Sequence, residues 1–330
     1  MKVKLPPASR VLITGGGGFV GHWLRQALIP ILSADACILS IGTRPGEIKI
    51  YSELESGITL DIRDEHAVDA LVETFNPSAI IHLAAISDVR EASQTPRMTW
   101  EVNFCGTMNL AYSVLRHSRN ARFIFVSSSE VYGDAFKRLN RPVDENVRLE
   151  PTNPYATSKA AADLLLGQLA CEGLKVIRFR PFNHTGPGQT DRFVIPAFAT
   201  QIARIKNGLQ EPTLRVGNLD ARRDFLDVRD VVDAYVLALA LPDKEWEAGR
   251  ILNLASGIPR RIGEILDELL ALAGVSVRIE QDPARARAND TLSAIGDATA
   301  ARRTLGWVPQ VPWEVTLRDL VASITTPSSI

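Results

Sequence analysis

Arg10-Val-Leu-Ile-Thr-Gly-Gly-Gly-Gly-Phe-Val-Gly21 is the stretch of this sequence that decides the fold. An apolar run typical of a strand leads into four consecutive glycines, and an amphipathic helical pattern follows. Glycines at such a turn let the backbone approach a pyrophosphate, and the free N–H groups of the helix N-terminus attract the phosphates. The glycines fit two motifs, G-x-x-G-x-x-G from Gly15 and G-x-G-x-x-G from Gly16. Both motifs include Gly18 and Gly21. The stretch therefore predicts a dinucleotide-binding turn.

Strand-like apolar runs alternate with helical patterns up to about residue 180. This alternation is typical of a doubly wound parallel sheet, so we expect a Rossmann-type α/β fold. The run that contains His82 is apolar throughout, which suits a strand covered on both faces, and we expect His82 to be a packed strand residue. Two long helical patterns, 98–117 and 155–172, flank the fifth run. The predicted strands are 11–14, 37–42, 58–60, 79–84, 123–127 and 176–180.

The alternation loosens after Pro181 into loops, helices and short strands, which predicts a smaller C-terminal α/β lobe that binds the substrate. We expect a dinucleotide-binding domain over 1–180 and a mainly substrate-binding lobe over 181–330, with part of 215–255 returning to the first domain. The predicted elements of this half are helices 193–208, 228–241 with Asp227 as N-cap, and 262–273, strands 214–217, 251–254 and 275–280, and a disordered tail at 325–330.

The composition excludes several classes of protein. The 37 basic and 38 acidic residues balance, which argues against a nucleic-acid-binding surface. The three cysteines stand far apart without a C-x-x-C pair, so neither a zinc site nor a disulfide framework is expected, and no metal is predicted. No signal peptide and no apolar run of membrane-spanning length is apparent, so we expect a cytoplasmic protein.

A second pattern carries the chemistry. Ser127-Ser-Ser-Glu-Val-Tyr-Gly133 follows the fifth predicted strand, and Tyr155 and Lys159 open a later helix. Their spacing of four places both side chains on one helical face, so the Lys159 ammonium is expected to lower the pKa of the Tyr155 phenol toward neutrality. Such a tyrosine exchanges a proton with a carbinol oxygen while a hydride moves to or from a nicotinamide, and Ser128 would orient that oxygen.

These patterns resemble the extended short-chain dehydrogenase/reductase family, whose nucleotide-sugar branch modifies the hexose of a nucleoside diphosphate sugar. The resemblance rests on T-G-x-x-G-F-x-G at Thr14 to Gly21, His82-Leu-Ala-Ala85, N-x-x-G-T at Asn103 to Thr107, and the Ser128, Tyr155 and Lys159 set. It implies adenine contacts from Asp61 and Ile62 and a structural role for Asn103. It also implies that the cofactor lies against Gly15, Gly18, Phe19, Val20, Gly21, Leu83, Ala84, Ala85, Tyr155 and Lys159.

Three further segments are similar to the GDP-mannose 4,6-dehydratase group: residues 180–189, 216–230 and 282–287. Within that group, Arg223-Asp-Phe-Leu-Asp-Val-Arg-Asp230 resembles the reductases that convert GDP-4-keto-6-deoxy-D-mannose to GDP-D-rhamnose. Arginines suit a diphosphate because they form charge-assisted, bidentate bonds with it. The resemblance implies substrate binding by Ser128, Glu130, Asn183, Val194, Arg223, Arg287 and Asp290, the last standing where the family has a glutamate.

The residues at the end of the second predicted strand indicate whether the cofactor is NADPH or NADH. A protein that prefers NAD usually places an acidic residue there for the ribose 2′-hydroxyl. This chain has Ser40-Ile-Gly-Thr-Arg44 instead, and Thr43 and Arg44 can receive a 2′-phosphate. NADPH is therefore the expected cofactor, with NADH as an alternative.

Several alternatives to the GDP-D-rhamnose-forming reductase stay open. Glu130 stands where a 4,6-dehydratase would keep the carboxylate that removes the C5 proton, so dehydration of GDP-mannose, alone or as a second activity, is one of them. The others are a reductase that forms GDP-6-deoxy-D-talose, another nucleotide-sugar epimerase or dehydratase, and a non-catalytic cofactor sensor. The resemblance also implies a homodimer, in which helices 98–117 and 155–172 pair into a four-helix bundle.

Overall fold

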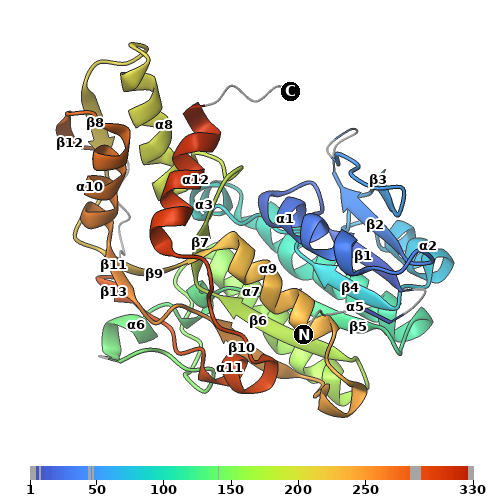
Figure 1. Ribbon diagram of the computed structural model, residues 1–330. Coiled ribbons are helices and arrows are strands. Elements are labelled where there is room, and N and C mark those ends of the chain that lie inside the picture. The colour runs from blue at the N-terminus through green and yellow to red at the C-terminus, as the bar shows by residue number, and fades with distance from the viewer. Residues whose placement is uncertain are drawn as a thin grey trace.

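A seven-stranded sheet forms the centre of the computed structural model, which describes residues 5–6, 9–43, 46, 48–139, 141–282 and 291–325. Its strand order is β10 (Arg250–Leu254), β6 (Val176–Pro181), β5 (Arg122–Val126), β4 (Ala79–His82), β1 (Arg10–Thr14), β2 (Cys37–Gly42) and β3 (Glu55–Thr59) (Figure 1). All neighbouring strands run parallel. The order reverses between β1 and β4, and in such sheets ligands bind outside the carboxyl ends of the strands at that point. The Rossmann-type α/β prediction is confirmed.

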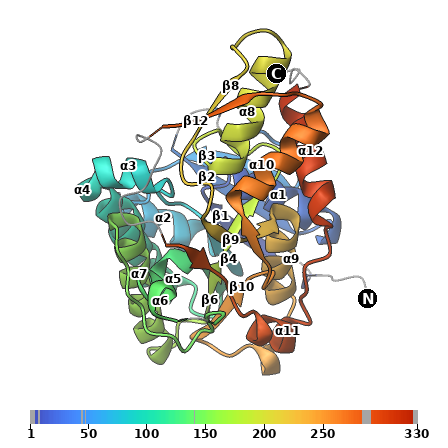
Figure 2. The same cartoon turned by 90° about the vertical axis from the view of Figure 1, so that its left-hand side faces the viewer.

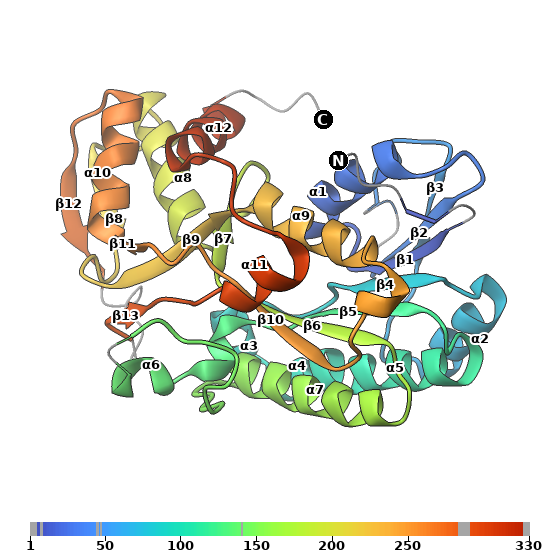
Figure 3. The same ribbon diagram turned by 60° about the horizontal axis from the view of Figure 1, so that its bottom comes forward.

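Both faces of the sheet are buried along strands such as β1, β4 and β6, as the uninterrupted apolar runs predict. Val11 and Ile13 of β1 belong to one apolar cluster, whereas Leu12 between them belongs to the other, because successive side chains of a strand point to opposite faces. The helices α1 (Phe19–Leu28) and α9 (Val228–Leu239) cover the first face, and α2 (Glu65–Phe75), α5 (Gly106–His117) and α7 (Pro154–Cys171) cover the second (Figure 3).

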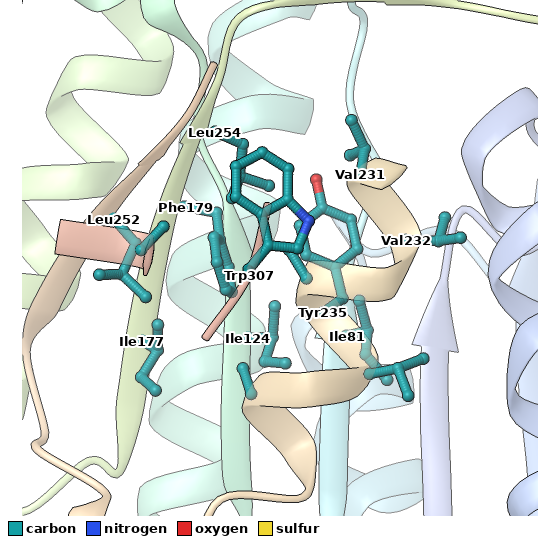
Figure 4. Packing of buried hydrophobic residues seen from close by; sticks show 14 of the residues in the cluster. Ile81, Ile124, Ile177, Phe179, Val231, Val232, Tyr235, Leu252, Leu254 and Trp307 are labelled. Carbon is teal, nitrogen blue, oxygen red and sulfur yellow. The ribbon is translucent and has the colours of Figure 1, made fainter. Parts of the chain in front are cut away.

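The first cluster joins the sheet to distant parts of the chain. Ile124 and Ile177 of neighbouring strands lie beneath Tyr235 of α9 and Trp307, which follows the short helix α11 (Thr299–Leu305) (Figure 4). The indole Nε1 of Trp307 donates to the carbonyl of Asp230 at 2.8 Å. The C-terminal part of the chain is thereby fixed to the face of the sheet that α1 also covers.

The helix predicted over 98–117 is not one regular helix. It consists of α4 (Pro96–Trp100), a π-helical turn η2 (Glu101–Cys105), and α5. The turn contains Asn103, whose side chain forms hydrogen bonds with both backbone groups of Ile86. Its Oδ1 accepts from the Ile86 N–H at 2.8 Å, and its Nδ2 donates to the Ile86 carbonyl at 3.1 Å. Such a turn inserts an extra residue and often marks a functional region. Here it aims the Asn103 side chain at the loop after β4.

A smaller lobe stands beside the carboxyl ends of the strands. It holds a four-stranded sheet of β7 (Asn183–Thr185), β9 (Arg222–Asp227), β11 (Pro259–Arg261) and β13 (Ser293–Ala294), and the pair β8 (Thr213–Val216) and β12 (Arg278–Gln281). The helices α8 (Val194–Lys206), α10 (Ile262–Ala273) and α12 (Trp313–Thr325) pack together beside them (Figure 2). They share a third apolar cluster built on residues such as Phe198, Leu266 and Leu317. The smaller α/β lobe expected after Pro181 is present.

Two elements within 215–255 lie on the large sheet: α9 packs beside α1, and β10 is the edge strand next to β6. The division of the chain into two functional domains near residue 180 stays a prediction. The remaining short segments are the helices α3 (Val89–Gln94) and α6 (Ala135–Arg138) and the 3-10 turns η1 (Ile29–Ile31), η3 (Ser129–Tyr132) and η4 (Asp243–Glu245). Within the described ranges, no helix is long and apolar enough to cross a membrane.

Candidate active site

The glycine turn between β1 and α1 has the close packing that its sequence predicts. Gly15 has a φ of +71°, and a Cβ added there would lie 2.8 Å from the backbone N of Ala84. A Cβ at Gly21 would lie 2.6 Å from the carbonyl oxygen of Gly15, so this glycine lets the helix rest on the turn. Gly16 is also confined, since its Cβ would lie 2.7 Å from the Cβ of Ser40. The two spacings seen in the sequence therefore describe one turn in which all these glycines are needed.

The N-terminus of α1 is open to an anion. Gly18 is its N-cap residue, no side chain caps the helix, and its first turn, which begins with Phe19 and Val20, holds no acidic residue. Helix N–H groups without a cap bind phosphate readily. Two buried hydroxyl groups, Ser40 Oγ in β2 and Ser127 Oγ after β5, have no hydrogen-bond partner among the described residues. The turn, the helix end and these hydroxyls fit a dinucleotide with polar groups along the strand ends.

Loop residues after β4 border the same turn. The N–H of Leu83 donates to the carbonyl of Thr14 at 3.1 Å, and the N–H of Ala84 donates to the Thr14 hydroxyl at 3.2 Å. His82 also bonds this hydroxyl, at 2.6 Å through Nδ1, and its Nε2 lies 2.8 Å from the hydroxyl of Thr107. Burial lowers the pKa of His82 to about 3, helped by the charge of Lys159. His82 is therefore a neutral, packed strand residue, as expected.

Tyr155 and Ser128 meet at the carboxyl ends of the strands. Tyr155 is the second residue of α7, and Ser128 precedes the turn η3 and accepts from the N–H of Glu130 at 3.2 Å. The Ser128 hydroxyl lies close enough to the Tyr155 phenol to affect its pKa. Burial raises the pKa of Tyr155 to about 12, the nearby Ser128 hydroxyl opposes this rise, and the nearby carboxylate of Glu130 adds to it.

Lys159 lies one turn further along α7 and is buried. Its Nζ donates to the carbonyl of Val126 at 2.7 Å and lies 5.0 Å from the centre of the Phe125 ring. Burial lowers the pKa of Lys159 to about 7, and the charge of Asp163 opposes this change. The expectation that Lys159 lowers the pKa of Tyr155 is wrong for this structure: burial dominates, and the pKa of the phenol moves upward.

Asn153 is a site residue that the sequence analysis missed. It is the N-cap of α7, where its side chain accepts from the N–H of Ala156 at 2.8 Å, and its Nδ2 lies 3.4 Å from Oε2 of Glu130. Asn-Pro before a helical pattern is a recognisable helix start, and it could have identified this residue. Asn153 places the Glu130 carboxylate beside the start of the helix that carries Tyr155.

Asn103 has the structural role that the family resemblance implies. Besides Ile86, its Nδ2 donates to the hydroxyl of Ser158 at 3.0 Å, and that hydroxyl donates to the carbonyl of Tyr155 at 2.8 Å. Asn103 thus ties the loop after β4 to the first turn of α7.

The expected adenine-binding residues have different environments. Ile62 is buried in the second apolar cluster and packs where a side chain at Gly106 would otherwise lie. Asp61 forms a salt bridge with Arg63 at 2.6 Å, and hydrogen bonds from Arg63 lower the pKa of the carboxyl group. Thr43 is exposed just after β2. Their contacts with a cofactor stay predictions, and Arg44 lies outside the described residues.

Residues expected to hold the sugar nucleotide come from three elements of the smaller lobe. Asn183 begins β7, Val194 is the exposed first residue of α8, and Arg223 is in β9. Nη1 of Arg223 donates to the carbonyl of Thr291 at 2.6 Å. These positions stay predictions of substrate contacts. Arg287 and Asp290 lie outside the described residues.

Asp224, next to Arg223, is a buried carboxylate that the sequence did not single out. It accepts hydrogen bonds from the N–H and hydroxyl of Ser256, at 2.8 and 2.6 Å, and from the N–H groups of Gly257 and Gly296, at 2.8 and 3.2 Å. Burial raises the pKa of Asp224, and these four bonds oppose that change. Asp224 fixes β9 to two distant loops and so holds Arg223 in place.

The two lobes are joined next to the glycine turn. The Phe19 ring stacks on His184, with centroids 6.3 Å apart, and Trp23 Nε1 donates to the carbonyl of Pro187 at 3.0 Å. The N-terminus of α1 therefore borders the segment 180–189 that the sequence linked to the substrate.

Comparison with known proteins places this geometry among nucleotide-sugar enzymes. A family model described as GDP-mannose 4,6 dehydratase matches residues 12–320. The chain is 37% identical to a GDP-6-deoxy-D-mannose reductase of Pseudomonas aeruginosa, over 95% of this chain and 96% of that protein. It is 30% identical to GDP-mannose 4,6 dehydratase 2 of Caenorhabditis elegans, over 80% and 72%. A solved structure of RMD from P. aeruginosa complexed with NADPH superposes with a TM-score of 0.81 and 33% identity, covering 96% of this chain and 99% of the other.

Proposed function

The chain belongs to the GDP-mannose 4,6 dehydratase family, and from this premise we propose that it reduces the C4 keto group of GDP-4-keto-6-deoxy-D-mannose to form GDP-D-rhamnose. The observation that carries the proposal is the meeting of Ser128, Tyr155 and Lys159 at the strand ends, beside the open N-terminus of α1. The identity to a GDP-6-deoxy-D-mannose reductase supports this choice of substrate.

The proposed cofactor is NADPH, which when bound supplies the hydride. The glycine turn and the uncapped first turn of α1 suit its pyrophosphate. Thr43, and Arg44 beyond it, would receive the 2′-phosphate, since the sequence places no acidic residue at this strand end. The NADPH complex of the P. aeruginosa structure supports the same choice.

Tyr155 is the proton donor in this proposal. With a pKa near 12, its phenol is protonated at neutral pH, as a general acid for ketone reduction must be. Ser128, whose hydroxyl lies near Tyr155, orients the substrate carbonyl toward the phenol. Lys159 lies on the same face of α7 as Tyr155, and its Nζ donates to the Val126 carbonyl. Its positive charge, when it is protonated, lies near the developing alkoxide. Each residue thus acts on the oxygen that gains the proton.

The first experiment measures NADPH absorbance with purified protein and either GDP-4-keto-6-deoxy-D-mannose or GDP-D-mannose. We expect oxidation of NADPH with the keto sugar alone. No oxidation with the keto sugar would contradict the proposal. Nuclear magnetic resonance of the product then distinguishes GDP-D-rhamnose from its C4 epimer, GDP-6-deoxy-D-talose.

A second candidate function is the 4,6-dehydration of GDP-D-mannose. The observation in its favour is that the Glu130 carboxylate lies close enough to Tyr155 to raise the pKa of the phenol. A carboxylate at this place can remove the C5 proton. A dehydratase regenerates its bound cofactor, so formation of the keto sugar from GDP-D-mannose without consumption of NADPH would demonstrate this activity.

We also propose a homodimer built through α4, α5 and α7. Large apolar side chains are exposed on these helices: Trp100 at 37%, Tyr112 at 42% and Leu164 at 64%. Extended apolar surface on adjacent helices suits a second copy of the same face, which would bury it in a four-helix bundle. The three cysteines are free thiols, which suits the proposed cytoplasmic location because thiols stay reduced there.

A further inference from the structure

A buried polar cluster lies behind the proposed catalytic residues. Its centre is Arg180 of β6, whose guanidinium binds both carboxylate oxygens of Asp163, at 2.9 and 3.0 Å. Asp163 is on α7, one turn beyond Lys159, and it also binds Arg178 at 2.9 Å. The Asp163 side chain is fully buried, and that of Arg180 is 4% exposed. This cluster fixes α7 to β6.

Arg180 also reaches the segment that carries Ser128 and Glu130. Its Nη1 donates to the hydroxyl of Tyr132 at 3.1 Å, and that hydroxyl donates to Oδ1 of Asn253 at 2.7 Å. Tyr132 ends the turn η3 and is fully buried. The phenol is therefore held from two sides, by β6 and by β10.

The segment has a second attachment to β6 at its other end. The N–H of Ser127 donates to the carbonyl of Phe179 at 2.8 Å. Phe179 and Arg180 are neighbours, so one strand holds the residues on both sides of Ser128 and Glu130. The same strand holds α7 through Asp163. Strand β6 thus holds both α7, which carries Tyr155, and the segment that carries Ser128 and Glu130.

Stability alone does not account for such a cluster. Replacing buried charges by packed apolar residues is often neutral or stabilising, because desolvation of the charges is costly. Hydrogen bonds of fixed length, in contrast, set the distance between two elements. Misplacement of a reacting group by about 1 Å can lower a rate by about a hundredfold.

We propose that Tyr132 is a positioning residue whose hydroxyl, held between Arg180 and Asn253, sets the place of Ser128 relative to Tyr155. Tyr132 touches neither of the reacting groups and acts through the backbone of η3. The inference rests on the proposed reductase activity for its kinetic test. It has a separate structural test that needs no substrate.

The kinetic test is Tyr132→Phe, which keeps the ring and removes only the hydroxyl. We expect kcat for the keto sugar to fall by about ten- to a hundredfold while KM changes little. Ser128→Ala should lower kcat on its own, and adding Tyr132→Phe to it should lower kcat no further, since both changes affect the same contact. Unchanged kcat in Tyr132→Phe, or losses that multiply in the double variant, would overturn the proposal.

Thr316→Val is the matched control. The buried Thr316 hydroxyl donates to Oδ2 of Asp227 at 2.7 Å, the same length as the bond from Tyr132 to Asn253, but it belongs to α12. We expect a similar drop in Tm with no change in kcat. An equal loss of kcat in the control would show that lost stability, rather than position, explains the Tyr132 variant.

The structural test is the crystal structure of Tyr132→Phe beside that of the unchanged protein. We expect the distance between Ser128 Oγ and the Tyr155 phenol oxygen to be longer in the variant. An unchanged distance overturns the proposal whatever the activity. An inactive unchanged protein would instead contradict the proposed function, so the two failures are distinguishable.

Discussion

At the scale of single residues, burial decides the protonation of the site more than charge does. Tyr155 lies one helical turn from Lys159, yet burial raises the pKa of the phenol to about 12. The pKa of Lys159 is lowered to about 7 by the same loss of solvent. A protonated phenol at neutral pH suits the reductive direction, in which the tyrosine donates its proton.

Tyr155→Phe tests this assignment. The variant keeps the ring but lacks the proton, so we expect kcat for NADPH oxidation with the keto sugar to fall by about a hundredfold or more. NADPH binding, measured by fluorescence titration, should stay within about threefold, since the glycine turn carries the pyrophosphate. Full turnover by Tyr155→Phe would rule out the proposed role of this residue.

His82 predicts a pH dependence of folding stability. The unfolded chain binds a proton at His82 below the ordinary pKa of 6.5, whereas the folded protein binds it only below about 3. Stability is therefore complete above pH 6.5 and is lost as the pH falls through that value. Each pKa unit is worth about 1.4 kcal/mol, so the loss through His82 at pH 5 is about 2 kcal/mol.

Urea unfolding at pH 7 and pH 5 measures this loss. His184 and His22 also have lowered pKa values, so they too make the folded protein less stable as the pH falls. The comparison is therefore with His82→Gln, which retains hydrogen-bonding groups but does not titrate. We expect the variant to lose about 2 kcal/mol less than the unchanged protein between the two pH values. Identical losses would mean that His82 does not resist protonation.

At the scale of elements, the glycine turn is the most constrained part of the site. Gly15→Ala meets both a positive φ and a Cβ contact of 2.8 Å with the backbone of Ala84. We expect Gly15→Ala to lower the free energy of unfolding by about 2–3 kcal/mol and to weaken NADPH binding at least tenfold. Urea unfolding and fluorescence titration measure the two effects.

Gly208→Ala separates strain from lost space. Gly208 has a similar φ of +68°, but no atom lies within 4 Å of an added Cβ. We expect a cost of about 1 kcal/mol there and unchanged NADPH binding. Equal effects of both substitutions would show that the close approach to Ala84 is unimportant.

Elements with a regular pattern were predictable from the sequence, and elements defined by distant partners were not. The helix predicted over 262–273 is α10 in full, because its apolar face repeats without interruption. The sequence pattern predicted no helix at Trp313–Thr325, where the structure has α12. Its buried face includes Thr316, a polar residue whose hydroxyl donates a hydrogen bond to Asp227, 89 positions earlier. The buried position of Asp224 was not predicted for the same reason, because its hydrogen-bond partners are distant in the sequence and meet it only in the folded chain.

The site shows the same division. Ser128 and Tyr155 were predicted by motif, and the structure places their side chains close together. The direction of the Tyr155 pKa could not be predicted, because it depends on how much water the folded chain excludes. Spacing along a helix indicates which groups are near each other, whereas burial depends on the packing of the whole chain.

At the scale of the whole molecule, the exposed apolar face of α4, α5 and α7 is the feature that the monomer leaves unexplained. α7 is buried on the sheet side, yet Leu164 on its outer side is 64% exposed. In the proposed homodimer this side chain lies in the interface, and a charge placed there would be desolvated without a partner. We therefore expect Leu164→Glu to be a monomer by light scattering at micromolar concentration, where we expect the unchanged protein to be a dimer.

Leu209→Glu is the control for this change. Leu209 is exposed to a similar extent, at 69%, but follows α8 in the smaller lobe, away from the proposed interface. We expect this variant to remain a dimer and to unfold at the same urea concentration as the unchanged protein. A dimeric Leu164→Glu would contradict the proposed bundle. Because α7 also carries Tyr155 and Lys159, we expect the Leu164→Glu monomer to have a lower kcat, since its outer face is then no longer held by the partner helix.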